Sequence, residues 1–394
     1  MKNSYTPIMP GFVIESPSAI VFGVNAIEML RETVEREGDR VLLVSGSRWL
    51  TSSGWSEKIS TLLSGLEIHP LACAEGEPST ESLAAALQAA RPVSPAVILA
   101  IGGGSVLDTA KALSALLRHG GPVTKYLEGV AGSVPVPGPG VPWIAMPTTA
   151  GTGAEVTKNA VIRATDLGVK RSMRSAYLLA RAVIVDPQLT CSLPLRVTGI
   201  SGLDALTQLV ESYVTKKANP FVGSLVQGAF GPMVTALDGL AAEPGNIEMR
   251  SAASYGALVS GIALANAGLG AAHGFAAALG GMFGVPHGLA CAVSLPYVLE
   301  ANAEVIRGPL GMLTASIRTG PAQGDPVGWL ADTVRRILSQ FELPLDLREY
   351  HIPAERVREI AEKSSGSSMS GNPRELSIAE REVILQKIVQ GREE

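Results

Sequence analysis

The sequence predicts a doubly wound (Rossmann-like) α/β domain over residues 1–192, followed by an all-α helical domain over residues 193–394. Three observations predict this fold class. In the first part, short apolar runs of β type alternate with helical patterns, as in parallel strands joined by right-handed crossovers. After about Leu193 the β-type runs stop and the pattern is almost wholly helical. A chain of 394 residues is also long enough to build two cores.

The elements of each part follow from apolar periodicity and turn residues. Strands are predicted at Ala19–Phe22, Arg40–Ser45, Ala96–Ile101, Pro142–Pro147 and Ala182–Asp186, with helices near Ala26–Glu37, Glu81–Ala90 and Val106–Leu117. In the second part, loops are expected at Asp238–Asn246, Gly320–Pro326 and Ser364–Pro373, before a last helix at Ile378–Val389.

Composition excludes several classes of protein. Charged residues make up 17% of the chain and apolar residues 46%, a balance that excludes disorder. The formal net charge of −4 comes without a block of like charges, so neither nucleic acid nor an anionic membrane is expected as a partner. Ser251–Leu299 carries no Lys, Arg, Asp or Glu, but glycine, proline and two histidines interrupt it. We therefore predict buried helices around a polar centre there, and no membrane span.

The cysteines and the N-terminus indicate a cytoplasmic protein. Cys73, Cys191 and Cys291 are odd in number and lack paired spacing, so they are interpreted as reduced core residues. The N-terminal segment has an early proline and no apolar core long enough for export.

Two glycine-rich segments each follow a predicted strand. Gly102-Gly103-Gly104-Ser105 opens a helix that contains Asp108 and Lys111, and such a start lets backbone N–H groups approach a phosphate. The second segment, Pro147–Glu155, offers threonine hydroxyls and backbone donors. Each segment alone could be an ordinary turn. Two of them at the carboxyl ends of parallel strands are what a dinucleotide crevice needs.

A metal site is indicated by four side chains in the helical part. Asp204 and Gln208 are spaced i, i+4 and share a helix face. His273 and His287 lie in the least charged stretch of the chain, where an unpartnered imidazole would be costly. The alternative is that both histidines are satisfied core residues.

These elements, in this order, resemble the iron-containing (group III) alcohol dehydrogenase family, whose relatives include glycerol dehydrogenase, maleylacetate reductase and dehydroquinate synthase. The matching segments are 102–111 (GGGSVLDTAK), 147–157 (PTTAGTGAEVT), 202–213 (GLDALTQLVESY) and 266–302 (NAGLGAAHGFAAALGGMFGVPHGLACAVSLPYVLEAN). The likeness runs from about Gly23 to the C-terminal SSMSGNPREL segment.

The resemblance implies a dehydroquinate synthase-like fold that transfers a hydride between a nicotinamide cofactor and a small alcohol or aldehyde. A homo-oligomer, most simply a homodimer, is also implied. The implied cofactor contacts are Gly102, Gly103, Gly104, Ser105, Asp108, Thr148, Thr149, Thr152, Asn159 and Lys170, and the implied ligands of a divalent iron or zinc ion are Asp204, Gln208, His273 and His287.

Cofactor choice can be argued from the end of the second strand. Ser45, Gly46 and Ser47, with Arg48 close by, stand where NAD-preferring members place an acidic residue. Without a carboxylate to repel a 2′-phosphate, NADP(H) is favoured over NAD(H). The alternative is a neutral turn that does not discriminate.

Two positions depart from the family pattern. Gln208 replaces a histidine of most members, which should weaken binding of a late transition metal and shift the preference toward zinc or a harder ion. Ala277 stands where many relatives carry a histidine thought to relay the alcohol proton, so no catalytic residue is predicted. Three alternatives stay open: a metal-independent reductase like maleylacetate reductase, a cofactor-binding protein without turnover, and a lyase like dehydroquinate synthase.

Overall fold

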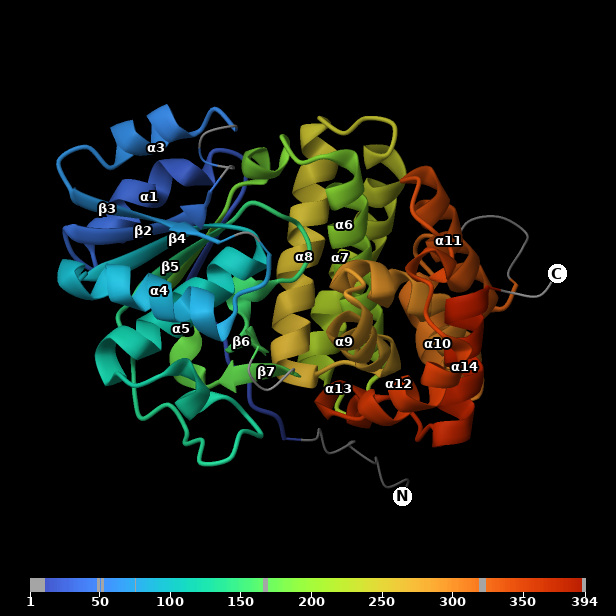
Figure 1. Ribbon diagram of the computed structural model, residues 1–394. Coiled ribbons are helices and arrows are strands. Elements are labelled where there is room, and N and C mark those ends of the chain that lie inside the picture. Colours follow the sequence, from blue (N-terminus) through green and yellow to red (C-terminus); the bar gives the residue numbers. More distant parts are fainter. Residues whose placement is uncertain are drawn as a thin grey trace, which may run out of the picture.

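The computed structural model describes residues 11–47, 50, 53–74, 76–165, 169–318 and 324–391. Figure 1 shows a sheet flanked by helices in one half of the molecule, which we call the sheet half, and a bundle of long helices in the other, the helical half. The last strand of the sheet ends at Val185 and the first long helix begins at Leu195. The boundary between residues 192 and 193 stays a prediction.

The sheet has six parallel strands in the order β1-β8-β5-β4-β2-β3. Their bounds are β1 Ala19–Phe22, β2 Arg40–Gly46, β3 Glu67–Cys73, β4 Val97–Gly102, β5 Trp143–Pro147 and β8 Ala182–Val185. The fold class and the five predicted strands are confirmed. The sequence did not predict β3, because this edge strand is only partly buried and Pro70 interrupts its apolar pattern.

Helices cover both faces of the sheet. Alternate residues of β2 belong to different apolar clusters: Leu42 and Val44 to one, Val41 and Leu43 to the other. The described α-helices of this half are α1 Leu30–Glu35, α3 Ser56–Leu62, α4 Thr80–Ala90 and α5 Gly104–His119, with short 3₁₀ turns such as Ala26–Met29 and Ala154–Val156. This two-sided packing is the doubly wound arrangement.

A two-stranded antiparallel ribbon, β6 Asn159–Ala164 and β7 Val169–Arg174, stands apart from the main sheet. The sequence did not predict it, because charged residues such as Arg163, Lys170 and Arg171 leave only short apolar runs in the two strands. The ribbon lies at the boundary with the helical half, beside α8 and α9 (Figure 1).

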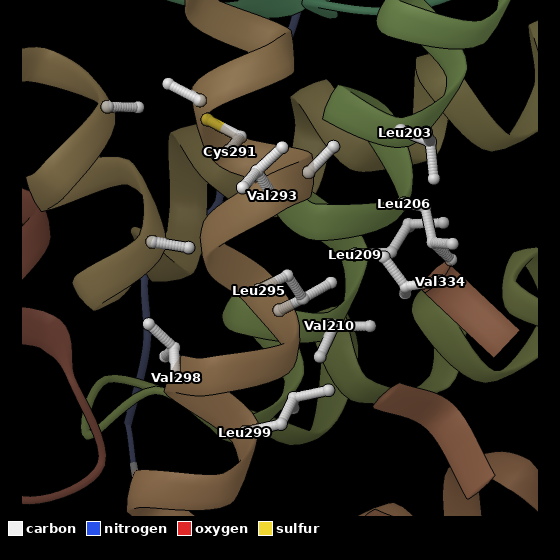
Figure 2. Close-up of a cluster of buried hydrophobic side chains, with 14 of the residues drawn as sticks. Leu203, Leu206, Leu209, Val210, Cys291, Val293, Leu295, Val298, Leu299 and Val334 are labelled. Atoms are coloured by element: carbon white, nitrogen blue, oxygen red, sulfur yellow. The ribbon is translucent and has the colours of Figure 1, made fainter. Parts of the chain in front are cut away.

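The helical half is built around α6 and α10. Its helices are α6 Leu195–Val214, α7 Pro220–Leu240, α8 Ile247–Ala267, α9 Ala271–Phe283, α10 His287–Thr314, α11 Pro326–Gln340, α12 Val357–Lys363, α13 Ser367–Gly371 and α14 Ile378–Gln390. Figure 2 shows part of the apolar cluster of this half, in which Leu206 and Leu209 of α6 lie beside Leu295 and Leu299 of α10. The predicted loop at 364–373 needs correction, because its serines and glycine form the short helix α13. Residues 319–323 of the predicted loop at 320–326 lie outside the described residues.

Within the described residues, two helices, α7 and α10, are long and apolar enough to cross a membrane by length and composition, and α8 with α9 would pass as one bent span. Neighbouring helices explain much of this apolar character, since 72% of the apolar window of α10 is buried inside the protein. The absence of a membrane partner stays a prediction.

Candidate functional site

The two glycine-rich segments emerge side by side from the sheet. Gly102 at the end of β4 pairs with Pro147 at the end of β5, and the Thr148 N–H donates a 3.0 Å hydrogen bond to the Gly102 carbonyl. Both segments therefore lie at the carboxyl edge of the sheet, where ligands of such folds bind.

Glycine is required where the two segments touch. A Cβ atom on Gly104 would lie 2.9 Å from Oγ1 of Thr152, and one on Gly103 would lie 3.3 Å from Cγ2 of Thr149. Helix α5 begins at Gly104, so its first N–H groups and the positive end of its dipole face this edge. The segments thus combine close backbone packing with free donors, which suits a phosphate group.

Lys111 ties the first segment to the ribbon. Its side chain is fully buried, and its ammonium donates to the Asp108 carboxylate, to the Thr157 hydroxyl and to the Asn159 carbonyl at 2.8–3.1 Å. Asp108 also accepts a hydrogen bond from the Val161 N–H. The Asp108 carboxylate thus holds α5 against β6 and helps to fix the position of the first glycine-rich segment.

The remaining predicted cofactor residues surround these segments. Ser45 of β2 pairs with Ile101 of β4, Gly46 is the last residue of β2, and Ser47 is exposed. Arg48 lies outside the described residues. Lys170 of β7 forms an ion pair with Glu77 at 2.6 Å. The contacts of these residues with a cofactor stay predictions.

The predicted metal ligands Asp204, His273 and His287 are brought together from α6, α9 and α10. With Cys291, they place one potential ligand atom each within 4.8 Å of one another. Oδ1 of Asp204 lies 3.5 Å from Nε2 of His273, and the two imidazole centroids are 5.5 Å apart. His287 is the partly exposed member, so the cluster has access to solvent.

The cluster fits a bound cation. Asp204 and His273 are buried, yet Oδ1 of Asp204 and Nε2 of His273 have no hydrogen-bond partner in the part of the chain that the structure describes. Unpaired buried polar atoms are costly, and a metal ion between them would satisfy both. Burial alone would raise the pKa of Asp204, but His273 and His287 outweigh this effect and lower it. Cys291, more than any other neighbour, raises the pKa of His287 to about 9. The surroundings therefore favour positive charge at this point.

Glu211, which the sequence analysis missed, fixes the orientation of His273. Its buried carboxylate accepts the Nδ1 proton of His273 at 2.7 Å and the backbone N–H groups of Gly270 and Ala272 at 2.9 and 2.7 Å. The start of α9 thereby holds the carboxylate, and Nε2 is left facing Asp204. Glu211 follows Asp204 by seven residues on one helix face, a spacing that could have revealed it.

Gln208 lies beside the cluster with its amide nitrogen toward it. The Ser260 hydroxyl donates to Oε1 of Gln208 at 2.8 Å. The amide nitrogen lies 3.4 Å from Oδ2 of Asp204 and 3.5 Å from the Thr152 carbonyl oxygen. Thr152 therefore touches Gly104 on one side and Gln208 on the other, so that the glycine segments and the metal cluster meet. Binding of metal by Gln208 stays a prediction.

Glycine segments at a sheet edge, facing a cluster of metal-ligating groups, are the arrangement of a nucleotide-dependent oxidoreductase. Comparison with known proteins agrees. Residues 17–187 match the model of the iron-containing alcohol dehydrogenase family, and residues 198–389 match that of the C-terminal part of the Fe-containing alcohol dehydrogenase family. The chain belongs to the iron-containing alcohol dehydrogenase family, and is an oxidoreductase acting on CH–OH groups.

Relatives and a solved structure cover between 70% and 96% of the chain. Long-chain-alcohol dehydrogenase 1 of Geobacillus thermodenitrificans is 36% identical over 70% of either chain. Sulfoacetaldehyde reductase of Bilophila wadsworthia is 31% identical over 93% of this chain and 96% of that one. A crystal structure of 1,3-propanediol oxidoreductase has a TM-score of 0.89 at 28% identity, covering 96% of this chain and 100% of the other.

Proposed function

We propose that the chain is an alcohol dehydrogenase or aldehyde reductase that favours NADP(H), transfers a hydride to or from a small substrate, and holds a divalent iron or zinc ion. The observation that carries this proposal is the double contact of Thr152. This residue packs against Gly104 of the first glycine segment and accepts from Gln208 beside the metal cluster. A cofactor bound along the segments would therefore reach the substrate side of the cluster.

The residues of this chain have separable tasks in the proposed reaction. Gly103, Gly104 and the start of α5 bind and orient the cofactor phosphates. Asp204, His273 and His287 hold the ion, and Glu211 keeps the Nδ1 proton of His273 in place so that Nε2 is free to bind. When bound, the nicotinamide would supply or accept the hydride while the ion polarises the substrate oxygen.

The preference for NADP(H) is supported by uncharged residues at the end of β2. Ser45, Gly46 and Ser47 bring no carboxylate to the position that would hold the adenosine ribose. Relatives differ in the cofactor that their names give: one butanol dehydrogenase is named as NADPH-dependent and one methanol dehydrogenase as NAD-dependent. The cytoplasmic location and the homodimer stay predictions.

A steady-state assay tests the proposal. Purified protein is given NADPH and a panel of short aldehydes, before and after treatment with a chelator, and with zinc or ferrous iron restored. We expect turnover that chelation removes and metal restores. Turnover that survives complete removal of metal would support a metal-independent reductase. Binding of NADPH without turnover in any metal form would contradict the enzymatic proposal.

A further inference from the structure

Cys291 is the member of the cluster that the proposed function leaves without a task. It follows His287 by one turn of α10, so that both side chains leave the same helix face. Its side chain is fully buried, and Sγ lies 3.7 Å from Nε2 of His287. In Figure 2 it precedes Val293 and Leu295 in the row of buried α10 side chains, with its sulfur at the margin of the apolar cluster.

Two separations in the cluster match those of atoms that share one metal ion. A tetrahedral zinc ion with Zn–S of about 2.3 Å and Zn–N of about 2.05 Å separates sulfur from nitrogen by about 3.6 Å. The same geometry separates nitrogen from oxygen by about 3.4 Å. The observed separations are 3.7 Å for Cys291 and His287 and 3.5 Å for His273 and Asp204.

The unpartnered atoms point to a ligand in this space. Among the described residues, Oδ1 of Asp204 and Nε2 of His273 are buried without a hydrogen bond. Asp204 and His273 each bring one potential ligand atom within 4.8 Å of the Cys291 sulfur. Gln208, which the sequence put among the ligands, has its oxygen occupied by the Ser260 hydroxyl at 2.8 Å. The sulfur is thus better placed to bind than the glutamine oxygen.

We propose that Cys291 binds the metal as a thiolate, completing a set of four with Asp204, His273 and His287 and favouring zinc over harder ions. The thiol gives up its proton to solvent when the sulfur–metal bond forms, and no electrons are transferred. Thiolate ligands select zinc, whereas oxygen ligands suit magnesium and manganese. The proposal rests on the metal half of the proposed function.

Cobalt substitution tests the thiolate without any assay of turnover. Metal-free protein is titrated with Co²⁺ alone, and the absorption spectrum is recorded. Bound by a thiolate, Co²⁺ gives an intense charge-transfer band in the near ultraviolet. We expect this band in the wild-type protein and its loss in Cys291→Ser and Cys291→Ala. Both variants should still bind Co²⁺, with Kd raised at least about tenfold, since even outer contacts of a metal site contribute that much.

The other two cysteines are matched controls. Cys73→Ser and Cys191→Ser change partly exposed cysteines outside the cluster, and both should keep the band. The wild-type spectrum decides even if a Cys291 variant fails to fold. Stoichiometric Co²⁺ binding without the band, or a band retained in Cys291→Ala, would overturn the thiolate and leave the proposed function standing. No binding of Co²⁺ by wild-type protein would contradict both.

Discussion

In the sheet half, the candidate site consists of glycine-rich backbone, which neighbouring groups can approach because glycine has no side chain. In the helical half, it consists of side chains whose ligand atoms lie close together. Gly104 allows Thr152 to approach, and a Cβ atom at position 104 would force the Thr152 side chain to shift. Asp204, His273 and His287 come from three different helices and meet at one point. The first half depends on local conformation, whereas the second depends on how helices pack.

This difference separates two kinds of damage. A change in the glycine segments should weaken cofactor binding and leave the metal in place. A change in the cluster should remove metal and leave the cofactor bound. The predictions for His273→Ala and Gly104→Ala test that separation directly.

The largest effect is expected for His273→Ala. The variant loses a ligand and leaves Glu211 without its imidazole partner, so metal content should fall steeply. Because Lewis-acid catalysis supplies several kcal/mol, kcat/KM should fall at least about a thousandfold, with NADPH affinity unchanged. Elemental analysis measures the metal content, and fluorescence titration measures the affinity for NADPH. His69→Ala, on the far edge of the sheet, is the control, and equal loss of activity there would break the comparison.

Glu155→Gln should change stability at the contact between the halves. Burial raises the pKa of Glu155 to about 7, and only Lys111 opposes this by charge. The folded protein then keeps the proton that the unfolded chain releases above its ordinary pKa, so stability falls as the pH rises from about 4.5 to 7 and levels off above. Relative to wild type, the glutamine variant should gain about 3 kcal/mol between pH 4 and pH 8, measured by urea unfolding.

At pH 4 both proteins carry an uncharged side chain at position 155, so their stabilities should then agree within about 1 kcal/mol. A constant difference across the whole range would show that the pKa of Glu155 is the same in the folded and the unfolded protein.

Gly104→Ala should weaken NADPH binding. Its Cβ would lie 2.9 Å from Oγ1 and 3.1 Å from Cγ2 of Thr152, and such overpacking costs about 1–3 kcal/mol. Isothermal titration should give a Kd about 10- to 100-fold higher, with metal content unchanged. Gly228→Ala on α7 is the matched control, because its Cβ would meet nothing within 4 Å. Loss of metal in Gly104→Ala would show that damage to the glycine segments also damages the metal cluster, and would contradict the separation.

The smallest effect is expected for Gly46→Asp. A side chain fits here, since among the described residues its Cβ would meet only Cγ2 of Val106, at 3.9 Å. A carboxylate at this strand end would repel the 2′-phosphate, so the ratio of kcat/KM for NADPH to that for NADH should fall about tenfold. An unchanged ratio would show that the end of β2 does not determine the choice between NADPH and NADH.

The sheet half was easier to predict from the sequence than the helical half. Strands β2, β4 and β5 were predicted because they are continuous buried apolar runs, whereas the edge strand β3 was not. The glycine segments were predicted because every residue of the signal is adjacent in the chain.

The metal cluster was predicted only in part. Asp204, His273 and His287 were named from residue type and resemblance, but the role of Glu211 depends on the start of α9, which only packing brings near. The orientation of Gln208 depends on Ser260 of another helix. Cys291 could have been suspected from its i+4 spacing after His287.

The central claim is that the two halves act on one substrate, and deuterium transfer tests it most directly. Protein loaded with zinc is given NADPH carrying deuterium at the transferable position of the nicotinamide, together with a short aldehyde, and the alcohol is analysed by mass spectrometry. We predict one deuterium on the carbinol carbon, at a rate that chelation abolishes. An alcohol without deuterium, or no alcohol despite bound NADPH and metal, would contradict the account.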